Sequence, residues 1–411
     1  MTLTGAPSVA CPDGDAALKQ RVHRRLVVDG ALVEGVRDSV GVGDRVLRSR
    51  LADLLRDEQP LLAAGRFEQL LEELTHEVAG LGALEPLLAD PTITEVMING
   101  PGRAYVERRG RLERVTLDLD AVAIVHLVER VVAPLGLRLD RASPMVDARL
   151  PDGSRLHAVI PPLAVDGPYV TIRRFGARAV DLAEFDVGVA AAGFLEWAVG
   201  AGWNLLVAGA TSAGKTTLLN ALSRSIPHAE RVVTIEETAE LRLDQPHVVR
   251  LEARPPNAEG VGGVTVRDLV RAALRMRPDR LVVGEVRSGE ALDMLQALNT
   301  GHDGSMSTIH ANGTADALAR LETLVLFADS GLPLGAVRAQ VTASVDAVVF
   351  VARGAAGERR VEGIAEVDGR GAGGMRPLFQ RHGGRLVCVA APARPPRRPE
   401  APKPDERWFR C

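Results

Sequence analysis

The residues best suited to chemistry lie between positions 203 and 217. An apolar run, Leu205 to Ala208, leads into a stretch that matches G-x-x-x-x-G-K-[ST], and a helix-forming run follows it. Strand before and helix after is the context that a phosphate-binding loop requires. The glycines let successive backbone N–H groups converge on phosphate oxygens at a helix N-terminus. We therefore predict a nucleotide-phosphate site formed by Gly209, Ala210, Thr211, Ser212, Ala213, Gly214, Lys215, Thr216 and Thr217.

Two side chains of this loop predict ATP and Mg²⁺ as ligands. The Lys215 ammonium can reach the β- and γ-phosphates, and the Thr216 hydroxyl can ligate Mg²⁺. Composition supports the role of the lysine: the chain holds 50 Lys and Arg residues, but its only lysines are Lys19, Lys215 and Lys403. Because the planar guanidinium does not replace an ammonium at such a position, a lysine there is unlikely to reflect drift.

Acidic residues follow two further apolar runs. Leu281 to Gly284 precedes Glu285, and Val232 to Ile235 precedes Glu236, with Glu240 soon after. At the ends of strands beside a phosphate loop, such carboxylates position the metal and the attacking water. We predict Glu240, Glu285 and Glu236 as catalytic residues, with Thr216, Glu285 and Glu236 as the metal ligands. The alternative is that these acids only begin a helix, where the helix dipole favours them.

Two histidines and two arginines complete the candidate site. His302 and His310 flank a small-residue strand and could sense the γ-phosphate or bridge subunits, although isolated histidines are usually structural. Arg155 and Arg173 lie in the strands that precede the phosphate-loop region. Either could stabilise the γ-phosphate of a neighbouring subunit. The alternative for each arginine is a solvated surface group.

Around these residues the patterning predicts an ordered series of segments. Residues 1–15 are small and polar and are expected to be disordered, and 16–90 carry amphipathic helical periodicity. Residues 91–180 show strand patterns and one helix, which predicts an α+β domain. Helices and strands alternate over 181–355, as in an α/β domain with a buried parallel sheet. Residues 356–411 are rich in Gly, Arg and Pro and are expected to be a variable, largely disordered tail.

The composition of the chain argues against some classes of partner and some cellular compartments. The formal charge is −3 and aromatic residues are 3% of the chain, which argues against a nucleic-acid partner. Cys11, Cys388 and Cys411 form neither a disulfide framework nor a zinc site, so a reducing cytosol is expected. No signal sequence or long apolar run is present. We expect a cytoplasmic protein that reaches the membrane only through partners.

Several motifs resemble those of secretion and pilus ATPases. Thr234–Glu240 resembles their Asp box, with Glu237 where the family has Asp; Arg277–Arg287 resembles their Walker B segment, and Thr300–His310 their His box. The resemblance covers about residues 65–355. Four stretches look specifically like the CpaF/Tad-pilus branch of the type II/IV secretion ATPases: Ile93–Gly100, Arg149–Pro162, Thr171–Phe175 and Arg254–Asn257. The four-cysteine zinc module of type II secretion ATPases is absent, which argues against that branch.

The resemblance implies an α/β fold, with a RecA-like P-loop ATPase domain preceded by a smaller α+β domain and an N-terminal helical segment. It further implies a homohexameric ring that hydrolyses ATP and works with an inner-membrane platform. By motif, Glu240 would polarise the attacking water, Glu236 and Glu285 would support metal and water, and His302 and His310 would couple the site to the ring. Alternatives are a conjugation or type IV secretion traffic ATPase, a nucleic-acid translocase, and a nucleotide-binding scaffold.

Overall fold

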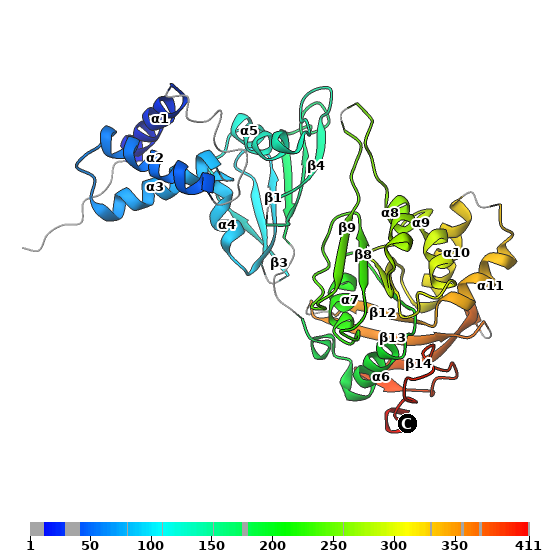
Figure 1. The fold of residues 1–411 in the computed structure, drawn as a ribbon. Helices are drawn as coiled ribbons and strands as arrows, with labels where there is room; N and C mark the ends of the chain where they lie inside the picture. Colours follow the sequence, from blue (N-terminus) through cyan, green and yellow to red (C-terminus); the bar gives the residue numbers. More distant parts are fainter. Residues whose placement is uncertain are drawn as a thin grey trace, which may run out of the picture. The chain divides into compact units, whose positions relative to one another are not determined.

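The computed structural model (Figure 1) describes residues 12–28, 42–79, 81–108, 110–150, 152–174, 180–257, 259–328, 331–354, 357–369 and 372–409. The chain divides into two compact units. The first holds residues 1–150 and 154–174, and the second holds 151–153 and 175–411. Most of the stretch predicted to be disordered, 1–15, lies outside the described residues, and α1 begins at Pro12.

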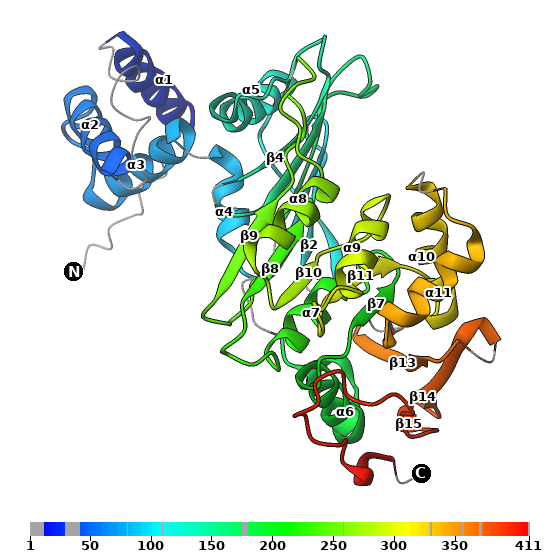
Figure 2. The ribbon, with the colours of Figure 1, turned by 45° about the vertical axis from the view of Figure 1, so that its right-hand side comes forward.

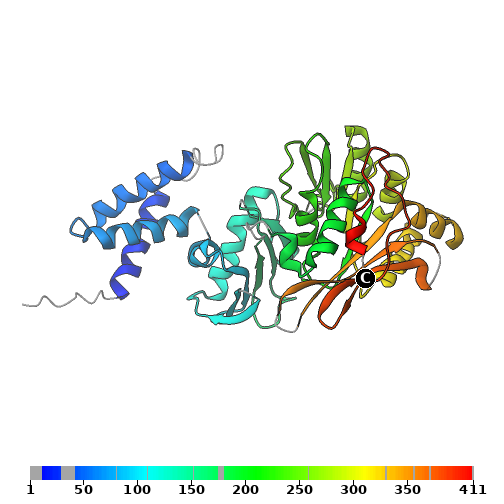
Figure 3. The same cartoon turned by 90° about the horizontal axis from the view of Figure 1, so that it is seen from below.

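Three amphipathic helices begin the first unit: α1 (Pro12–Val28), α2 (Val42–Glu58) and α3 (Ala64–Ala79). They lie side by side (Figure 3) because leucines three and four residues apart form one apolar stripe on each helix. Leu51, Leu55, Leu70 and Leu74 are buried at their shared core.

A six-stranded antiparallel sheet follows in the same unit, in the order β3-β2-β1-β6-β5-β4. Helix α5 (Ala121–Val132) begins at Asp120, whose side chain accepts a hydrogen bond from the Ala123 amide. Its buried face, which includes Ile124 and Leu127, packs into the core of this sheet. The short helix α4 (Glu85–Ala89) precedes the strands: β1 (Ile93–Asn99), β2 (Ala104–Arg108), β3 (Arg111–Val115), β4 (Met145–Arg149), β5 (Arg155–Val159) and β6 (Tyr169–Arg173).

The second unit is built on a nine-stranded sheet in the order β15-β14-β13-β12-β7-β11-β10-β8-β9. The strands from β12 to β9 in this order are parallel, so their carboxyl ends meet at one edge. The parallel strands are β7 (Leu205–Gly209), β8 (Val232–Glu236), β9 (Val248–Glu252), β10 (Arg280–Val283), β11 (Met306–His310) and β12 (Ala347–Arg353).

Helices cover both faces of this sheet (Figure 2). Side chains alternate along each strand, so Leu205 and Val207 join one core while Leu206 and Ala208 join the other. The first core includes α6 (Gly188–Gly200) and α7 (Lys215–Ser223). The second includes α8 (Val266–Ala273), α9 (Glu290–Leu298), α10 (Thr314–Phe327) and α11 (Leu334–Ser344). This arrangement explains why the strands read as continuous apolar runs.

The expectation of a largely disordered tail over 356–411 is wrong for its described residues. Three antiparallel strands extend the sheet beyond β12, and residues 390–409, here called the C-terminal segment, run beside α6 (Figure 2). The strands are β13 (Arg359–Val367), β14 (Met375–His382) and β15 (Arg385–Cys388). Trp197 Nε1 donates to the Pro402 carbonyl over 2.7 Å, and Trp203 Nε1 to the Pro395 carbonyl over 3.1 Å.

The arginines that suggested low complexity are the anchors of the C-terminal segment. Arg394 Nη1 and Arg397 Nε lie 2.6 and 2.5 Å from the two carboxylate oxygens of Asp346, which is 2% exposed. Arg398 Nη2 donates to Glu230 Oε2 over 2.7 Å. Paired with buried acids, a Pro/Arg-rich stretch becomes ordered structure. Among the described residues, no helix has the length and apolarity needed to cross a membrane.

Candidate functional site

The predicted phosphate loop connects β7 to α7 at the edge where the parallel strands end. Gly214, the residue before the first helical residue, has a φ of 102°, in the region that favours glycine. Ser212 also has a positive φ, 59°, which is uncommon for a residue with a side chain. These two left-handed residues curl the loop around the start of α7, as a phosphate cradle requires.

Lys215 is the central cation of this loop. It is only 7% exposed. Its Nζ donates to the Ala210 carbonyl over 3.1 Å and lies 3.3 Å from Nδ1 of His310. A buried ammonium needs such acceptors to compensate its lost hydration. The structure therefore brings the predicted lysine and one predicted histidine into direct contact.

His310 links the loop to Glu285. It ends β11, where it pairs with Gly209, and its Nε2 lies 2.6 Å from Glu285 Oε1. Burial lowers the pKa of His310; the carboxylate of Glu285 opposes this shift, while the charge of Lys215 adds to it. The lowered pKa favours the neutral imidazole.

Arg287 organises the acids beside His310. Its Nη2 donates to Glu285 Oε2 over 2.8 Å, and its Nη1 pairs with the Glu237 carboxylate. The hydrogen bond to Glu285 raises the pKa of Arg287, with the nearby acids adding to the effect. Arg287 was visible in the sequence two residues after Glu285, but nothing in the pattern indicated that it would join two strand ends.

Glu236 has a role that the sequence did not predict. It is 3% exposed, and its Oε1 accepts the backbone N–H groups of Glu240 and Leu241 over 2.9 and 3.0 Å. Burial raises its pKa to about 7, although the two amide bonds act in the opposite direction. The carboxyl of Glu236 thus holds the turn that carries Glu240. Its part in metal binding stays a prediction.

The donor set at this edge fits a hard divalent cation. Glu285 offers a carboxylate just after β10, and Thr216 offers a hydroxyl at the start of α7. Oxygen ligands of this kind suit Mg²⁺, which binds few protein groups and completes its shell with phosphate and water. Within the described residues, no three His, Cys, Asp or Glu side chains are grouped as a metal cage.

His302 does not join the cluster within this chain. It precedes β11, at the opposite end of the sheet from His310, and its Nδ1 lies 2.9 Å from the Ala297 carbonyl oxygen. The two histidines flank the strand as the sequence predicted: His302 lies in the loop before β11, and His310 is the last residue of β11. Coupling by His302 to another subunit stays a prediction.

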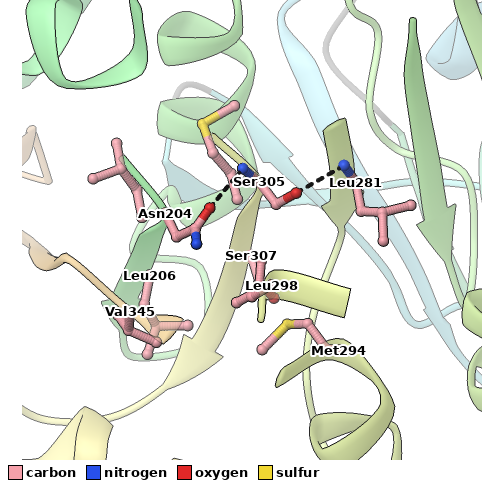
Figure 4. Close-up of a pocket in the computed structure, with 10 residues that line it drawn as sticks. Asn204, Leu206, Leu281, Met294, Leu298, Ser305, Ser307 and Val345 are labelled. Carbon is pink, nitrogen blue, oxygen red and sulfur yellow. Dashed lines mark hydrogen bonds between the residues drawn. The ribbon is translucent and has the colours of Figure 1, made fainter. Parts of the chain in front are cut away.

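The end of the sheet near His302 is held by a small polar network (Figure 4). Asn204 Oδ1 accepts the Ser305 amide over 3.0 Å, and Ser305 Oγ accepts the Leu281 amide over 2.9 Å. The cavity beside them has room for no more than about one water molecule, and apolar side chains such as Met294 and Leu298 line much of it. This cavity is too small for a nucleotide.

Arg155 and Arg173 are direct cross-strand partners in the first unit. The register pairs Arg155 on β5 with Arg173 on β6, and Arg149 on β4 with Arg155. Arg155 Nη2 donates to Asp147 Oδ1 over 3.0 Å. On its other side Arg173 pairs with Glu95 of β1, and such opposite-charge neighbours offset the repulsion between the two guanidinium groups. Their action on a neighbouring subunit stays a prediction.

Known proteins are similar to this chain over most of its length. A family model described as "Type II/IV secretion system protein" matches residues 77–362. A putative conjugal transfer protein of Mycobacterium tuberculosis strain H37Rv is 42% identical over 306 residues, covering 72% of this chain and 86% of the relative. The type IV secretion system protein PtlH of Bordetella pertussis is 38% identical over 328 residues, covering 70% and 94%.

Solved structures of similar fold include one ATPase and one pilus retraction motor. The Legionella pneumophila ATPase DotB is 21% identical with a TM-score of 0.51, covering 70% of this chain and 80% of that one. The pilus retraction motor PilT, solved with bound ADP, is 17% identical with a TM-score of 0.51, covering 69% and 81%. With the strand order β12-β7-β11-β10-β8, these likenesses confirm the predicted α/β, RecA-like P-loop fold.

Proposed function

This chain belongs to the type II/IV secretion system protein family, and from that premise we propose that it is a motor that hydrolyses ATP to ADP and phosphate. The observation that carries the proposal is the line of contacts from the phosphate loop to the acidic strand ends. Lys215 touches His310, and His310 touches Glu285. A lysine for the phosphates and a carboxylate for metal and water are the parts that this reaction needs.

In this proposal each residue has a distinct task. The backbone amides of residues 210–216 and the Lys215 ammonium hold the phosphates, and Thr216 and Glu285 would hold Mg²⁺, which neutralises charge developing on the phosphates. Glu240 polarises the attacking water, on a turn fixed by Glu236. When a nucleotide binds, its phosphate oxygens replace the present hydrogen-bond acceptors of Lys215, and Lys215 then loses its contact with His310. The imidazole of His310, which also contacts Glu285, thereby links nucleotide binding to that carboxylate.

We further propose a homohexamer that acts on an inner-membrane platform, with membrane contact through partners only. Arg155 and Arg173 would then complete the γ-phosphate site of the adjacent subunit, because an added guanidinium stabilises the charge of the transition state. The side-by-side placement of these two arginines supports a shared anion as their target.

Two machines are compatible with such a motor. The motifs that resemble the Tad branch favour assembly of Tad/Flp-type pili. The names of the relatives, a putative conjugal transfer protein and a type IV secretion protein, favour conjugation or type IV secretion. Neighbouring genes would separate them: small pilin genes support the first, and genes for a type IV secretion channel support the second.

The primary test of the nucleotide site is Lys215→Ala. We expect ATP affinity to fall more than about tenfold, because the variant loses a buried charge-assisted contact to phosphate. Equilibrium binding of ATP and steady-state phosphate release are the measurements. Lys403→Ala, at an exposed lysine, is the matched control and should behave as the wild type. Undiminished turnover by Lys215→Ala would remove the central assignment.

Glu285→Gln tests the catalytic step separately from binding. The amide keeps the size of the side chain but loses the charge that holds metal and water. We expect ATP binding within about threefold of wild type and hydrolysis slower by about 10²-fold or more. Wild-type turnover in this variant, or a loss of binding alone, would contradict the role given to Glu285.

A further inference from the structure

We propose that the hairpin between β12 and β13 supplies two arginines to the phosphate site of its own subunit. Arg359 contacts the phosphate chain of the bound nucleotide, and Arg353 positions the loop that holds it. The inference rests on the proposed function, since it presumes a nucleotide at the loop. Neither arginine lies in a motif that the sequence analysis singled out.

Strand β12 brings the hairpin to the loop. It runs parallel to β7 in a register that pairs Phe350 with Ala208, so its next residues pass beside the start of the phosphate loop. The approach is close: a Cβ placed on Gly209 would lie 2.4 Å from the Val351 carbonyl oxygen. Because β12 is held in the sheet on both sides, the end of β12 has a fixed position relative to the loop.

Arg353, at the end of β12, is bonded to the loop itself. Its Nε donates to the Ser212 carbonyl oxygen over 2.7 Å. Ser212 is the non-glycine residue of the loop whose backbone φ is positive. A hydrogen bond from a charged donor helps to hold such a backbone in place. Arg353 is therefore a positioning residue for the cradle.

Arg359 lies over the other left-handed residue of the loop. The antiparallel register pairs Arg359 directly with Arg353, so both side chains leave the hairpin on the same face. A Cβ placed on Gly214 would lie 2.7 Å from Cδ and 3.2 Å from Nε of Arg359. The missing side chain at Gly214 thus makes room for this arginine, immediately before the amides that open α7.

The next residue of β13, Arg360, serves as a contrast to Arg359. Arg360 points the opposite way and is paired with acids: its Nε lies 2.5 Å from Glu362 Oε1, and its Nη1 lies 3.7 Å from Glu358 Oε1. The face that carries Arg353 and Arg359 therefore turns guanidinium groups toward the phosphate loop.

The chemistry of the ligand accounts for arginines beside a lysine. A nucleoside di- or triphosphate is a polyanion, and Lys215 supplies one compact charge among the backbone amides of the loop. A guanidinium adds a planar fork that can donate two parallel hydrogen bonds to phosphate oxygens. Because Arg359 belongs to the subunit that owns the loop, its contribution appears in binding, whereas an arginine donated by a neighbour contributes mainly to turnover in the ring.

The test is Arg359→Met, with Arg360→Met as the matched control on the other face of the same strand. Methionine keeps much of the stem that packs on Gly214 and removes the charge. We expect the affinity for MgADP and for MgATP, measured by titration calorimetry, to fall about tenfold or more in Arg359→Met and to stay at the wild-type value in Arg360→Met. Arg359→Lys should recover part of the loss, because it restores a cation.

The thermal midpoint of the nucleotide-free protein separates binding from packing. The inference requires this midpoint to stay within about 2 °C of wild type in Arg359→Met. Wild-type nucleotide affinity in Arg359→Met overturns the inference. So does an equal loss of affinity in Arg359→Met and Arg359→Lys together with a lowered thermal midpoint, because a residue that only packs against the loop behaves in that way. If the wild-type chain binds neither nucleotide, the proposed function itself fails and takes this inference with it.

Discussion

Two acids that follow parallel strands in the same way have different chemistry because they differ in burial. Glu285 stays partly exposed, and its two carboxylate oxygens pair with Arg287 and His310. Glu236 is almost fully enclosed, and its carboxyl is turned back on the amides of Glu240 and Leu241. Enclosure disfavours the charged form, and it converts a candidate ligand into a support for its neighbour.

Glu236 should make stability depend on pH. Its pKa in the folded protein is raised to about 7 from a usual value of 4.5, so the folded state binds its proton more tightly than the unfolded state does. That contribution is fully present below pH 4.5 and is lost as the pH rises through about 7. In Glu236→Gln the side chain is neutral at every pH, so the variant does not lose this stability as the pH rises.

We therefore expect the thermal midpoint of the wild type to fall relative to that of Glu236→Gln between about pH 5 and about pH 8. Glu196→Gln, at an exposed position on α6, should follow the wild type throughout. Parallel curves for wild type and Glu236→Gln would show that the carboxyl of Glu236 does not titrate in this range.

At the scale of elements, β12 determines the shape of the phosphate loop as much as the loop sequence does. Gly209 is needed because the Val351 carbonyl approaches it, and its φ is not in the left-handed region. The two positions of the motif thus require glycine for different reasons. One faces a neighbouring strand, and the other takes a left-handed conformation beneath Arg359.

Gly209→Ala tests this reading of the loop. The added methyl would lie 2.4 Å from a backbone oxygen, so β7 or β12 must shift. We expect a loss of stability of about 1–3 kcal/mol with weaker ATP binding, because the shift reaches Ser212 and Gly214. Gly335→Ala, on α11 with nothing within 4 Å, is the control and should cost nothing. Denaturant unfolding of both variants is the measurement; equal midpoints would reject the close approach.

At the scale of the whole molecule, each unit has its own core, and the second unit is fastened at the end of the sheet opposite the phosphate loop. There the C-terminal segment contacts Asp346, just before β12, through arginines, Glu366 of β13 through the Ala393 amide, and α6 through aromatic rings. Asp346 accepts from the Asn204 amide as well as from Arg394 and Arg397, so the start of β7 and the start of β12 share one carboxylate.

Arg397→Gln should destabilise the second unit. Its guanidinium bonds Asp346 Oδ2 over 2.5 Å and Asp303 Oδ1 over 3.1 Å, and loss of a partner from an enclosed acid costs about 2 kcal/mol. Arg407→Gln removes a guanidinium from the same segment, but this one is largely exposed and pairs with Asp405, two residues away, so its loss should change the unfolding free energy much less. Equal unfolding free energies for the two variants would show that the segment contributes no anchoring.

The nucleotide loop, the acids at the strand ends and the alternation of the second unit could be predicted from the sequence. Each of these depends on neighbours in the chain, because the loop pattern directly follows its own strand and each acid directly follows an apolar run. Parallel strands then place their carboxyl ends together by geometry. The convergence of Lys215, His310 and Glu285 at one edge follows from that rule.

The tertiary structure alone decided which of these residues meet and what the arginines do. Of the two histidines that flank β11, His310 contacts Lys215 and Glu285, whereas His302 lies beside the Ala297 carbonyl. Glu236 became a support through burial. Arg359 reaches Gly214, and Arg397 reaches Asp346, across long stretches of chain. Such contacts depend on strand order and on packing between distant segments, and no local pattern of residue types encodes either of them.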